Sequence, residues 1–193
     1  KKKPRRRPAP IFLTSPVRAE YKKTKNRRIE TGRKQKRKRS PDARRKERGM
    51  LKLVVVGKVK NRALAEICAD FADRLKRFGG IEIAELKDST PERECEKILE
   101  SLKNFRGKVY VMSEEGKTFT SRGFSKRLED DELAGGSAFV IGSAYGLADE
   151  VKKRADVLMS MSPMTFTHEF ARAILLEQIY RAKTITAKTG YHH

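Results

Sequence analysis

The sequence predicts an α/β domain with a largely parallel sheet over residues 50–193. Short apolar runs of strand length alternate with segments in which apolar residues recur at every third or fourth position. This alternation is typical of strand–helix–strand units, in which a helix connects two parallel strands. No run approaches the roughly 18 consecutive apolar residues that a membrane span needs, so we expect no transmembrane segment and no membrane partner.

The first half of the domain contains two strands, each followed by a helix. Residues 51–57 form the first expected strand, and Gly79-Gly80 ends the helix after it. Residues 81–86 form the second strand. Thr90 is expected to cap the next helix, and Pro91 suits its first turn. The apolar face of the first helix carries Leu64, Ile67, Phe71, Leu75 and Phe78, and that of the second carries Ile98, Leu99 and Leu102.

The second half adds three strands and three helices. In chain order these are a strand at 108–113, a helix at 121–133, a strand at 137–142, a helix at 148–155, a strand at 157–161 and a long helix from His168 to Ile185. The helix at 121–133 carries four consecutive acids, from Glu129 to Glu132. Because neighbouring positions on a helix point in different directions, we expect a solvated face there and no metal site.

Most of the positive charge precedes this domain. The chain has 46 Lys and Arg against 25 Asp and Glu, a formal net charge of +21. Residues 1–49 hold 22 of the basic residues and four of the acids, so they carry +18, whereas residues 50–193 carry only +3. Like charges repel and few apolar residues offset the entropy of ordering, which predicts a disordered basic arm that binds polyanions. A solvated tail and an organelle-targeting segment are alternative interpretations.

Two loops after expected strands are suited to hold a ligand. Small residues from Gly142 to Gly146 let a ligand approach the backbone closely. Residues 161–168, Met-Ser-Pro-Met-Thr-Phe-Thr-His, mix apolar and hydroxyl side chains, which suits an adenosine-like ligand. Neither common nucleotide-binding fingerprint occurs.

Cys68 and Cys95 stand alone, so no zinc site or disulfide framework is expected. The chain has only three histidines, which gives little support to hydrolytic chemistry.

Six stretches occur in an order that a known family shares: Leu51-Lys-Leu-Val-Val-Val-Gly57, Phe139-Val-Ile-Gly-Ser-Ala-Tyr-Gly-Leu147, Leu158-Met-Ser-Met-Ser-Pro-Met-Thr-Phe-Thr-His168, Arg172, Glu177-Gln-Ile-Tyr-Arg-Ala182 and Tyr191-His192. In these stretches the domain resembles the ribosomal RNA large subunit methyltransferase H family of the SPOUT superfamily. The resemblance implies a homodimeric enzyme that methylates N3 of a pseudouridine in large-subunit rRNA. It also implies a trefoil-knotted α/β fold, whose threaded C-terminal segment forms the site for the cofactor, S-adenosylmethionine.

Site residues follow from the same resemblance. It implies cofactor contacts at Met112, Gly142, Met161, Ser162, Pro163, Met164, Thr165 and Phe166. It implies four catalytic candidates: His168, Arg172, Tyr191 and His192. Of these, Arg172 is expected to hold RNA or stabilise anionic charge, and Tyr191 with His192 to complete the substrate pocket. Ser143 and Thr167 depart from the Gly and Pro that the family usually has, and we expect them to alter the rigidity of the pocket without destroying it.

The expected function is therefore S-adenosylmethionine-dependent methylation of pseudouridine N3 in large-subunit rRNA, on assembled ribosomes or large subunits, without a metal. A second interpretation is a non-catalytic ribosome-associated or assembly protein that uses the same knotted scaffold to bind RNA. Methylation of another RNA, such as tRNA, is a third. We expect the protein in the cytoplasm, or alternatively in an organelle that contains bacterial-type ribosomes.

Overall fold

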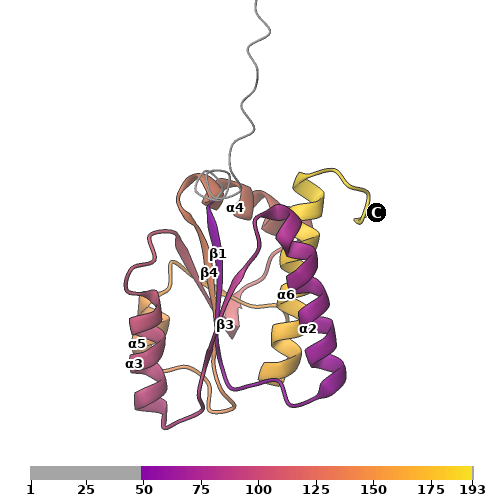
Figure 1. Ribbon diagram of the computed structural model, residues 1–193. Helices are drawn as coiled ribbons and strands as arrows, with labels where there is room; N and C mark the ends of the chain where they lie inside the picture. The colour runs from indigo at the N-terminus through magenta and orange to yellow at the C-terminus, as the bar shows by residue number, and fades with distance from the viewer. Residues whose placement is uncertain (1–48, 193) are drawn as a thin grey trace, which may run out of the picture. The chain divides into compact units, whose positions relative to one another are not determined.

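The computed structural model describes residues 49–192, so the predicted basic arm lies outside the described residues except for its last one (Figure 1). The strands are β1 (Met50–Val56), β2 (Glu82–Leu86), β3 (Lys108–Lys117), β4 (Gly136–Ile141) and β5 (Val157–Met159). The helices are α2 (Arg62–Leu75), the 3-10 turn η2 (Lys76–Phe78), α3 (Pro91–Leu102), α4 (Ser121–Leu133), α5 (Asp149–Arg154) and α6 (His168–Thr186).

All five strands lie in one sheet in the order β2-β1-β4-β3-β5, and every neighbouring pair is parallel. The predicted α/β class with a parallel sheet is confirmed. In a parallel sheet the carboxyl ends of all strands meet at one edge, here called the carboxyl edge, and the amino ends meet at the opposite, amino edge. The threading of the C-terminal segment into a knot stays a prediction.

Helices cover both faces of the sheet. Helices α3 and α5 lie on one face and α2 and α6 on the other, as Figure 1 shows with the sheet seen edge-on. Successive side chains of a strand point to opposite faces, so β1 serves two cores at once. Leu53 packs with residues of α2, α4 and α6, whereas Val54 packs with residues of α3 and α5. Both side chains are fully buried, which explains why β1 is a continuous apolar run.

Side chains cap the starts of α2, α4 and α6, but not those of α3 and α5. The Asn61 side chain accepts a hydrogen bond from the backbone N–H of Leu64 at 3.2 Å and so caps α2. Pro91 lies in the first turn of α3 as predicted. Thr90 occupies the predicted cap position with extended backbone angles, but its side chain makes no cap hydrogen bond. The backbone N–H of Ser89 instead donates to Glu94, at 2.8 Å.

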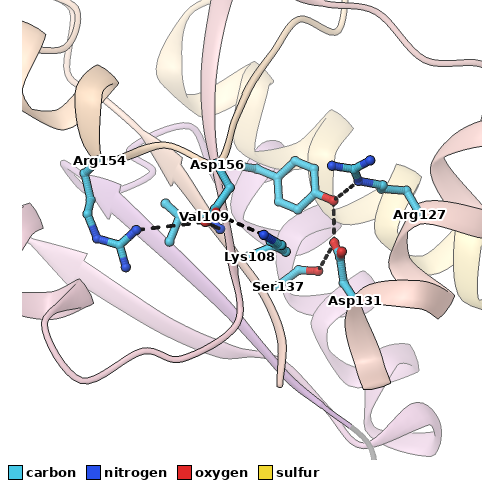
Figure 2. A network of polar contacts seen from close by, with 8 residues as sticks. Lys108, Val109, Arg127, Asp131, Ser137, Arg154 and Asp156 are labelled. Carbon is cyan, nitrogen blue, oxygen red and sulfur yellow. Dashed lines mark hydrogen bonds and ion pairs between the residues drawn. The ribbon is translucent and has the colours of Figure 1, made fainter. Parts of the chain in front are cut away.

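The acidic run on α4 is not a uniformly solvated face, so that prediction is wrong for part of the run. Asp131 is only 4% exposed. Its carboxylate accepts hydrogen bonds from the hydroxyl groups of Tyr110 and of Ser137, the latter at 3.0 Å (Figure 2). Burial raises the pKa of Tyr110, and the hydrogen bond to Asp131 raises it further. Asp131 lies inside because it follows Phe124 and Leu128 along the helix face that packs on the sheet.

The neighbouring acid of this run is also engaged. Glu132 forms an ion pair with Lys183 of α6, a lysine that is only 6% exposed. On the same side, the hydroxyl of Ser125 donates to the backbone carbonyl of Ala182 at 2.8 Å. These polar contacts connect α4 to the C-terminal half of α6 at the amino edge.

A second polar cluster fixes the start of β5 at the amino edge. The Asp156 carboxylate accepts hydrogen bonds from the backbone N–H of Val109, at 2.9 Å, and from the Lys108 ammonium, at 3.1 Å (Figure 2). Arg154 lies 3.9 Å from the same carboxylate. The cluster links the turn after α5 to the start of β3, and so it fixes the amino ends of β3 and β5 relative to each other.

The strand boundaries differ from prediction mainly near β5. Strand β3 runs four residues beyond its predicted end, because after a register shift Met112 and Lys117 both pair with Met159. Strand β5 ends at Met159 and not at the predicted residue 161. The chain after it is therefore free to form a loop. Among residues 49–192, no helix has the length and apolar character needed to cross a membrane.

Candidate functional site

A cavity of about 1050 Å³ opens at the carboxyl edge of the sheet. Its walls come from the end of β3, the loop after β4, the loop after β5 and the first turn of α6. Eight of the twelve predicted site residues line it: Met112, Gly142, Met161, Ser162, Met164, Thr165, Phe166 and His168. Pro163, Arg172, Tyr191 and His192 do not. The structure thus brings the three predicted cofactor segments together and separates three of the four catalytic candidates from them.

The loop after β4 folds back on itself as a tight turn. Ser143 and Gly146 form an isolated antiparallel bridge, and the backbone N–H of Gly146 donates to the Ser143 carbonyl at 3.1 Å. Gly146 has a φ of 82°, which favours glycine. A side chain at Gly142 would place its Cβ 2.7 Å from the Gly146 carbonyl oxygen. Glycine is therefore required at position 142 by the close approach of the returning loop.

Serine and threonine hydroxyls order the loop after β5. The buried Ser160 hydroxyl donates to the backbone carbonyl of Ser162 at 2.8 Å, and the Ser162 hydroxyl accepts from the N–H of Met164 at 3.0 Å. Thr167, where the family usually has Pro, is the N-cap of α6, and its hydroxyl accepts from the N–H of Phe170 at 3.4 Å. The threonine therefore gives α6 a side-chain cap that a proline cannot supply.

His168 begins α6 and closes one side of the cavity. It lies close to the end of β1, because a Cβ added to Gly57 would stand 3.3 Å from Nε2 of His168 and 2.9 Å from the Asp88 carboxylate. Gly57 has a φ of 87°, so glycine suits this position on both grounds. Asp88 was not among the predicted site residues. Its signal in the sequence is its place two residues after β2, at the same edge where the other strands end.

The cavity also contains charged residues that the sequence analysis missed. Glu114, Lys152 and Glu169 all contribute to its lining. The backbone N–H of Asn61 donates to Glu169 at 3.0 Å, and this hydrogen bond lowers the pKa of that carboxyl. It also ties the loop after β1 to the first turn of α6. Glu114 had a readable signal, since it directly follows the predicted end of β3.

Arg172 lies behind the cavity. It is 8% exposed, and its guanidinium pairs with Glu85 of β2 at 2.5 Å. Its Nε atom is buried and makes no hydrogen bond to another residue in the described part of the chain. Within one chain, Arg172 therefore fastens α6 to the edge strand β2 and does not reach into the cavity.

Tyr191 and His192 follow α6, and Tyr191 folds back against the middle of this helix. The Tyr191 hydroxyl donates to Glu177 at 3.1 Å, and its ring meets the ring of Tyr180 edge-on, with centroids 4.9 Å apart. Burial raises the pKa of Tyr191, and the hydrogen bond to Glu177 adds to this. His168 and Tyr180 are twelve residues apart on one helix, which separates them by roughly 18 Å. One chain therefore keeps its tail away from its own cavity.

Within residues 49–192, no three His, Cys, Asp or Glu side chains gather in a way that would hold a metal ion. The site is a cavity of mixed apolar and polar character built on backbone turns. Its shape and lining suit an organic ligand that approaches the carboxyl ends of parallel strands.

Comparison with known proteins places this chain in a class of methyl-transferring enzymes. Residues 50–192 match the family described as predicted SPOUT methyltransferase, and the chain belongs to that family. The resemblance found in the sequence is therefore confirmed at the level of the family.

Two curated relatives carry a more specific name. The chain is 41% identical over 157 residues to the ribosomal RNA large subunit methyltransferase H of Streptococcus gordonii, which covers 74% of this chain and 98% of the relative. It is 37% identical over 156 residues to the protein of the same name from Streptococcus pneumoniae, with the same coverage. A solved structure of a probable methyltransferase from Bordetella pertussis Tohama I is similar over 73% of this chain and 98% of that chain, with a TM-score of 0.45 and 13% identity.

Proposed function

We propose that this chain transfers the methyl group of S-adenosylmethionine to N3 of a pseudouridine in large-subunit rRNA. The observation that carries the proposal is the cavity at the carboxyl edge, lined by the three segments in which the family resemblance places the cofactor. Relatives up to 41% identical, named as large-subunit rRNA methyltransferases, support the RNA substrate. We further propose that residues 50–193 carry this activity in the cytoplasm and that the arm at 1–49 adds RNA affinity.

The residues of the cavity fit S-adenosylmethionine. Met112, Met161 and Phe166 supply apolar surface suited to an adenine ring. The turn at Gly142 leaves backbone groups uncovered by a side chain, so they are available to the polar edge of the base. Glu114 and Glu169 supply carboxylates suited to ribose hydroxyls or to the ammonium group of the methionine part.

The reaction requires the chain to align the RNA base with the cofactor, to exclude water and to remove one proton. When bound, S-adenosylmethionine supplies an electrophilic methyl group on a sulfonium sulfur. The cavity loops have to hold the RNA base so that N3 faces the methyl carbon in line with the C–S bond, because such alignment supplies much of the rate enhancement. Transfer of the methyl group to N3 would also require that a residue of the chain accept the N3 proton. His168 lies in the cavity, and we assign its imidazole as the acceptor.

Arg172 is assigned a positioning role, because its contact with Glu85 holds the first turns of α6, and with them His168, against the sheet. Pro163 has no place in the lining and is assigned to the shape of the loop after β5. Arg172 and Pro163 are therefore removed from the predicted residues that touch substrate or cofactor. Tyr191 and His192 do not reach the cavity of their own chain either.

We propose that the protein acts as a homodimer in which the tail of one subunit completes the cavity of the other. Neither Tyr191 nor His192 lines the cavity of its own chain. Tyr191 packs against Glu177 and Tyr180, which lie roughly 14 and 18 Å along α6 from His168, so a second copy can bring the tail to a cavity that its own chain does not reach. The rim of the cavity offers an apolar surface for such a contact. Four exposed apolar side chains stand on it: Tyr145, Met164, Phe166 and Phe170.

The experiment is methyl transfer from labelled S-adenosylmethionine to purified large ribosomal subunits, with the modified nucleotide located by mass spectrometry. We expect one labelled pseudouridine in the large-subunit rRNA, and His168→Asn should reduce transfer about a hundredfold or more while cofactor binding persists. Saturable cofactor binding with label in another RNA would redirect the substrate assignment. Absence of saturable binding by calorimetry would favour a non-catalytic RNA-binding scaffold.

A further inference from the structure

Arginine and aromatic side chains gather where the end of α2 meets the end of α6. We name Arg74, Arg77, Tyr180, Arg181 and Tyr191 the arginine–tyrosine cluster. The Arg77 guanidinium lies 4.5 Å from the centroid of the Phe78 ring and 5.4 Å from that of Tyr180. Arg74 lies 5.9 Å from the Tyr180 ring, and Arg181 lies 4.9 Å from the Tyr191 ring. The rings hold these guanidinium groups by cation–π contacts.

The cations around this cluster differ in their partners. Arg74 pairs with Asp70 at 2.8 Å, and Arg181 pairs with Glu177 at 2.5 Å. Lys76, next to Arg77 in the chain, pairs with Asp73 at 2.6 Å. Among residues 49–192, no carboxylate forms an ion pair with Arg77. The cluster therefore carries one positive charge in excess, and that charge is on Arg77.

Arg77 is also accessible. Its side chain is exposed, and the chain turns away after it through Gly79 and Gly80. No heavy atom lies within 4 Å of the place where a Cβ of either glycine would stand, so the turn that follows Arg77 is uncovered. A guanidinium fixed by rings on one side and open on the other loses little side-chain entropy when an anion binds.

We propose that Arg77 binds a backbone phosphate of the rRNA substrate beside the tail that carries Tyr191. This inference rests on the proposed function for the identity of the RNA. The Tyr180 ring lies between the two residues, 5.4 Å from the Arg77 guanidinium and 4.9 Å from the Tyr191 ring. Tyr180 is buried and fixes the Arg77 guanidinium from the protein side, whereas the ring of Tyr191 is only partly buried. A planar guanidinium is suited to a phosphate, and a partly exposed ring is suited to a base of the same RNA. The cluster thereby extends the RNA contact beyond the cavity.

A simpler explanation of Arg77 is the helix dipole, since a cation near a helix C-terminus stabilises the helix. Lys76 is in the same turn, so its charge stabilises the helix C-terminus in the same way. Unlike Arg77, it contacts no aromatic ring among residues 49–192 and is paired with Asp73. Lys76→Gln is therefore the matched control for Arg77→Gln. Both variants remove one charge from the same turn of the full-length chain.

The test measures binding of the full-length wild type and the variants to a large-subunit rRNA transcript between about 50 and 200 mM KCl. Arg77→Gln should weaken binding about five- to tenfold and reduce the slope of log affinity against log salt by about 0.7, the loss of one phosphate contact on a single strand. Lys76→Gln should leave the slope as in the wild type. Arg77→Lys keeps the charge and should keep the slope.

The salt dependence of these variants decides whether Arg77 contacts a phosphate. An unchanged slope in Arg77→Gln, or equal losses in Arg77→Gln and Lys76→Gln, contradicts the assignment and returns Arg77 to the helix dipole. A slope reduced in Arg77→Lys as much as in Arg77→Gln contradicts a phosphate contact. Melting temperatures of all variants within a few degrees of wild type exclude misfolding as the cause. Wild type that transfers no methyl group to large subunits contradicts the proposed function, whereas this inference is decided by the binding slopes alone.

Discussion

The two edges of the sheet are built in opposite ways. The amino edge is filled: Asp131 is 4% exposed and accepts bonds from two hydroxyl groups, and Asp156 binds a backbone N–H and two cations (Figure 2). The carboxyl edge is hollow, with a cavity of about 1050 Å³ and with Tyr145 and Met164 more than two-thirds exposed. At the amino edge the polar groups form buried contacts between elements, whereas at the carboxyl edge hydrogen bonds such as that of Asn61 to Glu169 order loops around an open cavity.

This difference teaches where stability and function reside in the domain. Side chains that hydrogen-bond to one another at the amino edge hold the strands in place. Because the strands are held, the points at the carboxyl edge where the loops begin are held as well. The loops then need only short-range turns, such as the Ser143–Gly146 bridge, to hold their shape. We therefore expect substitutions at the carboxyl edge to change ligand binding and substitutions at the amino edge to change the free energy of unfolding.

The largest effect is expected at the carboxyl edge, from Gly142→Val. The new Cβ would stand 2.7 Å from the Gly146 carbonyl oxygen and 2.8 Å from Leu147 Cγ, so the loop after β4 must move. We expect the Kd for S-adenosylmethionine to rise about a hundredfold, as measured by calorimetry, with little change in the midpoint of thermal unfolding. Ser143→Ala is the control. A Gly142→Val protein that binds cofactor like wild type would contradict the cofactor site.

At the amino edge, Asp131→Ala should lower the free energy of unfolding by about 2 kcal/mol, because the hydroxyl groups of Tyr110 and Ser137 lose their acceptor. Urea unfolding followed by circular dichroism measures this change. Asp130→Ala is the matched control on the same helix, since Asp130 is exposed and forms only a surface pair with Lys126, worth less than about 0.5 kcal/mol. Equal losses in the two variants would remove the distinction between the buried and the solvated acid.

A smaller effect depends on pH. Burial tends to raise the pKa of Asp156, but the Val109 N–H and then Lys108 lower it more, so its pKa lies below the ordinary value. A depressed pKa in the folded state stabilises the protein above the unfolded pKa of about 3.9, and the contribution is lost as pH falls below that value. Asp156→Asn should therefore be less stable by about 1 kcal/mol at pH 7.

The difference between wild type and Asp156→Asn should shrink as the pH is lowered from about 4 to 2, because the wild-type carboxyl then becomes neutral as well. Thermal unfolding at a series of pH values measures it. A difference that stays constant over this range would show that the charge of Asp156 does not contribute.

Much of the fold could be predicted from the sequence, because strands buried on both faces are continuous apolar runs and helix ends carry local signals. The helix at Ser121–Leu133 was predicted to the residue. The inward turn of Asp131 was not, because a buried carboxylate depends on partners at Tyr110 and Ser137 that are distant in sequence. The extension of β3 was missed for a similar reason, since it depends on pairing with Met159.

For the site, sequence patterns located the loops but not the geometry between them. The loops that follow β4 and β5 could be predicted because small and hydroxyl residues interrupt the apolar pattern there. The separation of Tyr191 from the cavity could not, because the resemblance supplies residues without their positions, and the fold of the tail against Glu177 depends on contacts in three dimensions. Arg77 was missed altogether, since its environment is made by rings from η2 and α6.

The central claim is that the cavity of one subunit and the tail of another act together in methyl transfer. The direct measurement mixes two variants, His168→Ala and Tyr191→Ala, each expected to be inactive alone on large ribosomal subunits. In a mixed dimer, one site receives an intact His168 and an intact Tyr191. After subunit exchange, the mixture should recover about a quarter of wild-type transfer, because half of the dimers are mixed and each has one intact site. A mixture that stays inactive after exchange, with mixed dimers shown by native mass spectrometry, would contradict the claim.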